Sequence, residues 1–246
     1  MAQHVRWLGA LVVLLAAASA LPTSNAAFTD QVASTDNTWT SMAQFTAAGV
    51  DLKSAATYSV LAWTDVSNSG NSVLTHALGV SPGVTVTGFP PGVAGSIHVA
   101  DNLAAQAQRD LTSAYRATQA LTATHGFSGD QNAITFTPGV YFTGAAFALT
   151  GTMTLDAGGD PNASFIFQID AAMNTAAGSK MVLAHGARAA KVFFQVAGAA
   201  GAGALSSMVG TVMAQGAITA GAGAVVNGRL LSLGKVTLSE NTITTP

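Results

Sequence analysis

Two stretches near the end of the 246-residue chain decide the fold: Val209-Gly-Thr-Val-Met-Ala-Gln-Gly-Ala-Ile-Thr219 and Asn227-Gly-Arg-Leu-Leu-Ser-Leu-Gly-Lys-Val-Thr237. They align at an offset of 18 residues, with glycine and threonine at identical places. Gly198, Gly216 and Gly234 continue the same spacing. A period of this length is that of one coil of a β-solenoid, in which each coil stacks on the next through main-chain hydrogen bonds. The repeat therefore predicts stacked coils.

Strand alternation sorts the side chains of these stretches into two sets. The set predicted to point inward is Val212, Ala214, Ile218, Leu230, Ser232 and Val236. The set predicted to point outward is Thr211, Met213, Ala217, Thr219, Arg229, Leu231, Lys235 and Thr237. An outward column of Met213 and Leu231 would be costly in water, so we expect a helix to cover it.

One long helix is predicted at about residues 97–122. This segment has no glycine or proline between Ile97 and Leu121, and good helix formers dominate it. Its apolar residues recur at steps of three and four and form one stripe. The stripe consists of Leu103 or Ala104, Ala107, Leu111, Ala114, Thr118 and Leu121. Ser96 or Asp101 is placed to cap the start. A rod of roughly 35 Å with one apolar stripe must lie against something of similar length.

The rest of the chain predicts strands. Short alternating apolar runs occur at 134–137, 150–155, 165–169 and 192–196, separated by Gly, Asp-Gly or Pro turns. The run Phe167-Gln168-Ile169 is echoed by Phe194-Gln195-Val196 at a distance of 27 residues, which is one coil plus a loop.

Composition excludes several classes of function. Charged residues make up 8% of the chain, the formal net charge is −2, and nine Lys and Arg do not form the basic face that nucleic-acid binding needs. Cysteine is absent, and the histidines lack the local spacing of a zinc site. The sequence has a single glutamate, Glu240, so a paired-carboxylate site would depend on scattered aspartates. We therefore predict no catalytic residues, no metal site and no cofactor.

The N-terminal residues predict export. Residues 1–26 carry Arg6, an apolar run too short to span a membrane, and small residues before a cleavage site after Ala26. We expect a signal peptide at 1–26, a polar leader at 27–53 and the solenoid domain at 54–246. No second apolar span follows, so the predicted product is a secreted monomer without a membrane span.

Several motifs resemble the bacterial and fungal ice-binding protein family. They are Ile97-His-Val-Ala-Asp-Asn-Leu-Ala-Ala-Gln-Ala-Gln108, Thr137-Pro-Gly-Val-Tyr141, Asp160-Pro-Asn-Ala-Ser-Phe-Ile-Phe-Gln-Ile169, Gly178-Ser-Lys-Met-Val-Leu183, Val192-Phe-Phe-Gln-Val196 and Asn227-Gly-Arg-Leu-Leu231. The resemblance runs from about Tyr58 to Ile243 in the family's order. It implies a right-handed, three-faced, discontinuous β-solenoid with one long flanking α-helix. It also implies ice as the partner, since many members bind ice and restrain its growth.

The physical requirements of ice binding select candidate residues. A flat, rigid array of small side chains, often threonine, can order water into an ice-like layer, whereas charged side chains hold their own hydration shells. A solenoid repeats its outward residues at the strand spacing of about 4.8 Å. The candidates are Thr150, Thr152, Thr154, Ala217, Thr219 and Thr237. Lys235 lies beside Thr237 and interrupts the array.

Two other hypotheses stay open at this point. A cell-surface or extracellular-matrix protein uses the same scaffold for adhesion or assembly, with the 27–53 leader as a candidate attachment segment. Hydrolysis of a polysaccharide on a β-helix requires clustered acidic side chains, for which Asp156, Asp160 and Asp170 are the candidates.

Overall fold

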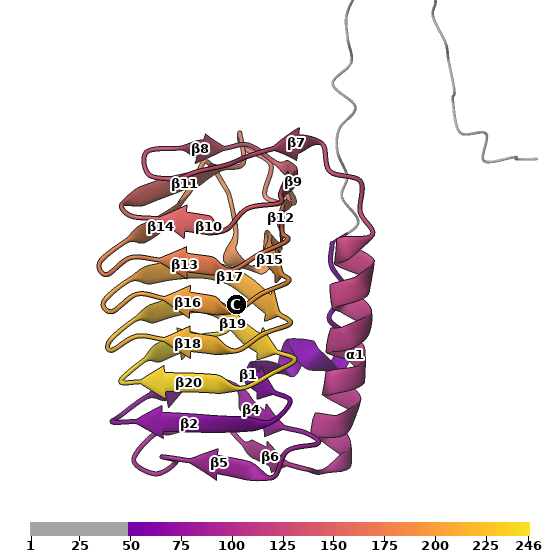
Figure 1. Ribbon diagram of the computed structural model, residues 1–246, viewed down its shortest axis with the longest axis vertical. Helices are drawn as coiled ribbons and strands as arrows, with labels where there is room; N and C mark the ends of the chain where they lie inside the picture. Colours follow the sequence, from indigo (N-terminus) through magenta and orange to yellow (C-terminus); the bar gives the residue numbers. More distant parts are fainter. Residues whose placement is uncertain (1–48) are drawn as a thin grey trace, which may run out of the picture. The chain divides into compact units, whose positions relative to one another are not determined.

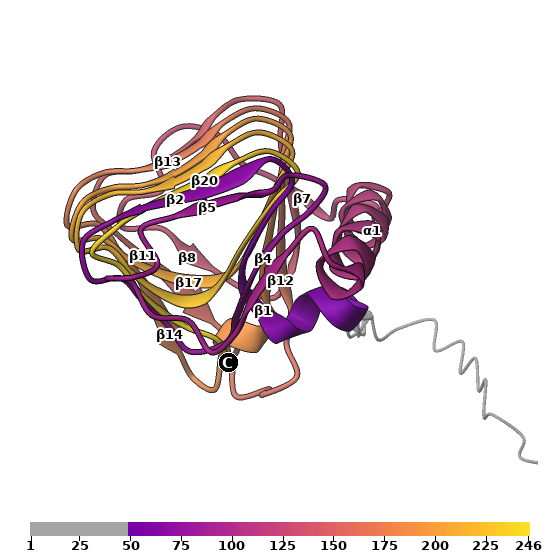
Figure 2. The same ribbon diagram turned by 90° about the horizontal axis from the view of Figure 1, so that it is seen from below.

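The computed structural model describes residues 49–246, so the predicted signal peptide and the leader up to residue 48 lie outside the described part of the chain. The described chain is a mainly β solenoid with one long α-helix beside it (Figure 1). Its strands form a 14-stranded and a 7-stranded sheet, and all of their pairings are parallel. Seen along the stack, the coils outline a triangle with three faces (Figure 2). The predicted three-faced solenoid with a flanking helix is confirmed.

The face beside the helix, here called the helix face, runs in the order β6-β4-β1-β19-β17-β15-β12-β9-β7. The bounds of its strands are Ile97–Val99 (β6), Ala77–Val80 (β4), Tyr58–Ala62 (β1), Val225–Ser232 (β19), Ser207–Ala214 (β17), Val192–Val196 (β15), Phe165–Ile169 (β12), Gly139–Thr143 (β9) and His125–Gly126 (β7).

The other two faces are built from shorter strands. The 7-stranded sheet, here called the open face, comprises Phe147–Leu149 (β10), Met173–Thr175 (β13), Ala200–Ala202 (β16), Ile218–Ala220 (β18), Val236–Ser239 (β20), Asp65–Ser69 (β2) and Thr85–Thr87 (β5). The third face comprises Thr135–Phe136 (β8), Thr152–Asp156 (β11), Lys180–Ala184 (β14), Thr242–Thr244 (β21) and Val73–Leu74 (β3), together with the first residues of β17 and β19. Two short 3₁₀ helices, Lys53–Thr57 (η1) and Ala189–Lys191 (η2), complete the fold.

The stacking order is not the chain order. The early strand β1 pairs with the late strand β19, where Leu61 lies opposite Leu231. Likewise β2 pairs with β20, so the first coils of the domain stack directly on the last one. Figure 1 shows this as indigo strands lying beside yellow ones. The discontinuity that the family resemblance implied is confirmed.

The 18-residue repeat of the sequence determines the pairing register of strands β17 and β19. Strands β17 and β19 pair over their whole length, with Gly210 opposite Gly228 and Thr211 opposite Arg229. A Cβ atom on Gly228 would lie 1.8 Å from the carbonyl oxygen of Gly210, so only glycine fits at this corner. The 27-residue echo is confirmed as well, because Phe167 pairs with Phe194.

Inside the solenoid, aromatic rings stack from coil to coil. The ring of Phe167 stacks between those of Tyr141 and Phe194, at centroid distances of 5.3 and 4.9 Å. Phe167 and Phe194 are fully buried. In-register repetition therefore turns one phenylalanine per coil into a continuous core column.

The helix α1 spans Asn102–Gln119, which is shorter than the predicted 97–122. The prediction was wrong at the start because Ile97–Val99 form β6, whose β-branched residues pair with β4. Asp101 caps the helix, since its carboxylate accepts a hydrogen bond from the Ala104 N–H at 2.8 Å. Residues 49–246 contain no helix with the length and apolar character of a transmembrane span.

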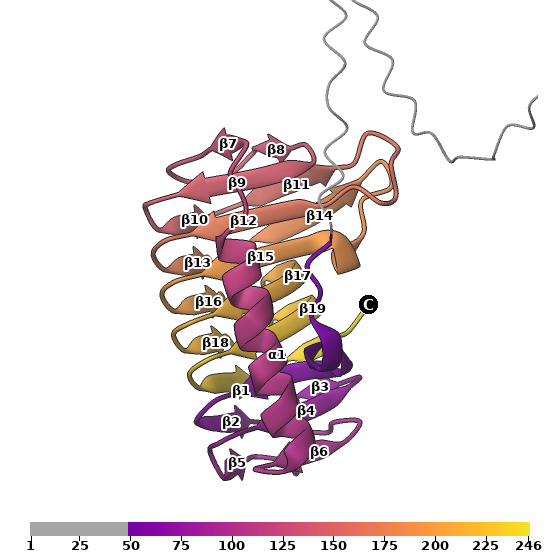
Figure 3. The ribbon, with the colours of Figure 1, turned by 90° about the vertical axis from the view of Figure 1, so that its right-hand side faces the viewer.

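The helix α1 runs along the helix face (Figure 3), and its buried residues Ala107, Leu111 and Ala114 belong to one apolar cluster with residues of that face. Met213 and Leu231 are fully buried against a cluster that includes Leu111, which confirms the predicted bed for the helix. Two outward glutamines of this face also hold the helix. The Gln195 amide donates to the Tyr115 hydroxyl at 2.6 Å, and that of Gln168 donates to carbonyls at the C-terminal end of α1.

Candidate functional site

One ladder of small side chains runs along the outside of the open face. Each of the seven strands contributes one outward residue, in register with those of the neighbouring strands. In stacking order these residues are Ala148, Asn174, Gly201, Thr219, Thr237, Ser67 and Thr87. All are uncharged and partly or fully exposed. At a strand spacing of about 4.8 Å the ladder is roughly 29 Å long.

Alternation places large apolar residues on the inner side of the same strands. Phe147, Met173 and Val236, which flank ladder residues in sequence, are fully buried in the core. The outward residues next to them are too small to pack against a covering helix. The sheet is therefore anchored from within and bare on the outside.

The columns beside the ladder contain the charges of this face. The carbonyls of Ala217 and Lys235 accept bonds from β16 and β18, which places these residues side by side, two residues before Thr219 and Thr237. Lys235 is exposed, as the predicted interruption required. On the next strand Asp65 occupies the equivalent position, directly before the paired Val66 and Val236. Both of these charges lie in one side column. The seven ladder residues are uncharged, and the next residue in register beyond Ala148 is the exposed Asp130.

The structure divides the predicted site residues between two faces. Ala217, Thr219 and Thr237 lie together on the open face. Thr152 and Thr154 lie on β11 of the third face, where they pair with Lys180 and Val182. They therefore do not share a plane with Thr219 and Thr237.

Thr150 lies at a corner, between β10 and β11. Its hydroxyl and its main-chain N–H both donate to the carboxylate of Asp130. These hydrogen bonds keep the pKa of Asp130 below its usual value. Thr150 therefore fixes a corner and does not extend the ladder.

Sequence analysis missed the ladder residues Ala148, Asn174, Gly201, Ser67 and Thr87. Their spacing is irregular because the loops between coils differ in length. The step from Asn174 to Gly201 is 27 residues, whereas that from Gly201 to Thr219 is 18. The ladder then jumps from Thr237 back to Ser67. A fixed-period search finds only the steps of equal length.

The third face offers a less even surface. Its exposed residues include Val73, Val182 and Val225, each more than two-fifths exposed, and the charged Lys180. Exposed valines stand on this face, whereas the ladder of the open face has alanine, glycine, serine, asparagine and threonine; each face carries one exposed lysine, Lys180 and Lys235. Of the two uncovered faces, the open face is therefore the smoother.

Reactive clusters are absent from the described part of the chain. Residues 49–246 contain no group of three His, Cys, Asp or Glu side chains arranged to hold a metal ion. Asp156 pairs with His185 at 2.8 Å, and bonds from Gly158 N–H and His185 lower the pKa of its carboxyl group. Asp156, Asp160 and Asp170 do not form such a group within the described residues.

Comparison with known proteins identifies the class. A family profile described as ice-binding-like matches residues 60–244, and the chain belongs to this family. An ice-binding protein from Nostoc sp. (strain HG1) is 40% identical over 196 residues, covering 78% of this chain and 72% of the relative.

Solved structures agree with this assignment. The crystal structure of an ice-binding protein from the Antarctic ascomycete Antarctomyces psychrotrophicus matches with a TM-score of 0.79 and 38% identity, covering 80% of this chain and 98% of that one. An ice-binding protein from an Antarctic biological consortium matches with a TM-score of 0.78, also at 38% identity, over 80% of this chain and 90% of that one.

Proposed function

We propose that this protein adsorbs to ice through its open face and thereby inhibits ice growth or recrystallisation. The observation that carries the proposal is the ladder of seven small, uncharged residues in register from Ala148 to Thr87. Adsorption needs no reactive group, so the proposed role is non-enzymatic. The signal peptide expected at residues 1–26 agrees with an ice-binding role outside the cell.

The physical argument rests on hydration. A charged group in the plane of contact keeps its own oriented water and opposes a lattice of another geometry. Methyl and hydroxyl groups at a regular strand spacing hold waters in a repeating arrangement that merges with ice. Because the parallel strands are fixed by main-chain bonds, the array is ordered before binding, and adsorption loses little conformational entropy.

The relatives described above support ice binding over adhesion as the function. Each is named an ice-binding protein, and their names make no mention of adhesion. Within the chain, the third face with its valines and lysine is the surface that agrees less well with ice.

The test places bulky side chains on one face at a time. The variant Thr219→Tyr/Thr237→Tyr raises two rings above the ladder, and Thr152→Tyr places the same ring on the third face as the matched control. In a recrystallisation assay we expect the double variant to need about tenfold more protein, equivalent to about 1.4 kcal/mol of lost adsorption free energy. The control keeps wild-type activity. The unfolding temperature of both variants stays close to that of the wild type, since substitutions at surface positions change stability by only about 0.5 kcal/mol.

The outcomes separate the face from the function. If Thr152→Tyr loses activity and the double variant keeps it, the ice-binding surface is the third face. If the wild-type protein neither slows recrystallisation nor shapes ice crystals, ice binding itself is wrong.

A further inference from the structure

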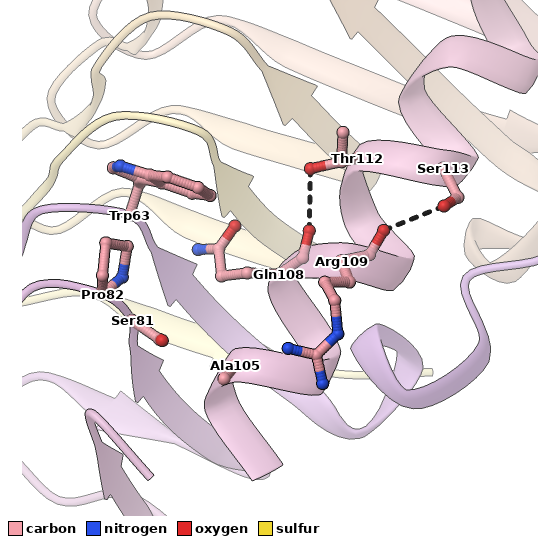
Figure 4. Close-up of a pocket in the computed structure, with 8 residues that line it drawn as sticks. All are labelled: Trp63, Ser81, Pro82, Ala105, Gln108, Arg109, Thr112 and Ser113. Carbon is pink, nitrogen blue, oxygen red and sulfur yellow. Dashed lines mark hydrogen bonds between the residues drawn. The ribbon is translucent and has the colours of Figure 1, made fainter. Parts of the chain in front are cut away.

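A pocket of about 600 Å³ lies between α1 and the corner where β1 leads to β2, outside the ladder of the open face (Figure 4). Its walls include Trp63, Ser81, Pro82, Gln108, Arg109 and Thr112. This volume lies within the range of small-molecule sites, and such sites combine apolar walls with a few polar groups. The lining contains one cationic side chain and no carboxylate.

Trp63 gives the pocket an aromatic wall. Its main-chain N–H donates to the Gly234 carbonyl at 2.7 Å, which fixes the residue at the corner. Its side chain is 42% exposed and belongs to neither apolar cluster of the fold. Figure 4 shows the indole above Pro82 and opposite the helix. An indole in this position offers a stacking surface without serving the core.

Gln108 forms part of the pocket wall and is itself almost fully buried. The residue is 2% exposed, and its amide nitrogen donates to the Ser232 carbonyl at 3.4 Å. Its Oε1 atom has no hydrogen-bond partner among the described residues. Less than 1 Å² of this Oε1 atom is accessible, so a bound molecule does not contact it in this arrangement. Gln195, in contrast, bonds the helix through its amide.

Further polar groups lie around this amide. The Thr112 hydroxyl donates to the Gln108 carbonyl at 2.8 Å and keeps its lone pairs free to accept. The Ser81 hydroxyl points toward the helix from the coil below (Figure 4). Arg109 bonds Gln106 through Nε and Nη2, at 3.2 and 2.7 Å, which leaves its Nη1 donors for another partner.

We propose that this pocket binds a saccharide. A pyranose ring presents an apolar C–H face for Trp63 and a rim of hydroxyls, each of which both donates and accepts. Hydroxyls of the ring meet Ser81 and Thr112. The guanidinium of Arg109 favours a sugar with a carboxylate, so a uronic acid binds more tightly than the matching neutral hexose.

The test uses galacturonic acid and galactose as probes on the whole chain, with binding followed by calorimetry and by saturation-transfer NMR. For a ligand of this size we expect a Kd of about 1–10 mM. Trp63→Ala weakens both sugars by about tenfold, as expected for loss of the stacking surface. Trp63→Phe retains a ring and recovers part of the affinity, which separates stacking from damage to the corner.

Two further variants sharpen the assignment. Arg109→Ala removes the preference for galacturonic acid and leaves galactose binding unchanged. Arg116→Ala, which removes an exposed arginine of the same helix outside the pocket lining, leaves both affinities unchanged. Saturable binding that survives Trp63→Ala, or no saturable binding of either sugar, overturns the proposal. Recrystallisation activity is expected to survive Trp63→Ala, so failure here and failure of the proposed function are distinguishable.

Discussion

The helix face and the open face are made by the same coils, yet one is covered and the other is bare. On both faces alternate residues point inward to one core and outward to the surface. The difference is the size of the outward residues. The helix face carries Ile166, Phe193, Met213 and Leu231 there, whereas the open face carries alanine, glycine, serine, asparagine and threonine.

This difference decides what can bind each face. Burying one large apolar side chain contributes about 1.5–3 kcal/mol of stabilising free energy, so a column of such side chains keeps the helix packed on the sheet. Small side chains cannot hold a helix in this way and leave the sheet exposed. The bare face is therefore free to meet an extended partner, and the covered face gives the solenoid rigidity.

The largest effect is expected from a substitution on the covered face, where it removes packing between the helix and the sheet. Leu111 is fully buried between α1 and the sheet, so Leu111→Ala should lower the free energy of unfolding by about 2–5 kcal/mol. Urea unfolding measures the loss. The exposed Leu103 of the same helix provides the matched control, because Leu103→Ala should change stability by no more than about 0.5 kcal/mol.

Below its unfolding temperature the Leu111→Ala protein should still inhibit recrystallisation, because its open face is unchanged. Equal stability losses for the two leucine variants would contradict the assignment of a buried helix face.

A smaller effect is expected where the helix begins. Asp101→Ala removes the cap on the Ala104 N–H and should cost about 1 kcal/mol at neutral pH. That N–H and the bond to His98 lower the pKa of Asp101 in the folded state. The stabilisation is therefore present above the ordinary aspartate pKa of about 3.9 and is lost as the pH falls through the lower folded value.

The difference in unfolding free energy between wild type and Asp101→Ala should thus shrink as the pH falls below about 4, measured by urea titrations along a pH series. A difference that stays constant down to pH 2 would show that the carboxylate is not the cap. The Asp51→Ala variant, at an exposed aspartate outside α1, serves as the control for general acid effects.

The sequence predicted whether a side chain points into or out of the solenoid more accurately than it predicted which of the three faces the residue lies on. The repeat between Val209 and Thr237 predicted the pairing of β17 with β19 and the helix bed at Met213 and Leu231. Parity alone also marked Thr152 and Thr154 as outward. Outward on a strand does not say which face the strand belongs to, since that depends on where the chain turns a corner.

Gly201 repeats the period of 18 residues before Thr219, whereas the other missed ladder residues were beyond any local pattern. Ser67 and Thr87 join Thr237 only because the first coils stack on the last one. That contact is set by long-range packing, which no fixed period in the sequence records. The start of α1 was missed for a related reason: Ile97–Val99 become a strand through pairing with β4, against the helical character of the residues that follow.

The smallest expected effect concerns the charge on the bare face. Lys235 is exposed beside Thr237, in the column that also contains Ala217. Lys235→Ala extends the small-residue surface by one position and removes a hydration shell from the plane of contact. We expect recrystallisation inhibition to improve by about twofold, equivalent to about 0.4 kcal/mol, with the free energy of unfolding unchanged within about 0.5 kcal/mol.

Lys180→Ala on the third face removes the same charge from the other uncovered surface and should leave activity unchanged. An equal gain from both variants would mean that net charge alone sets the activity, and the open face would lose its claim as the adsorbing surface.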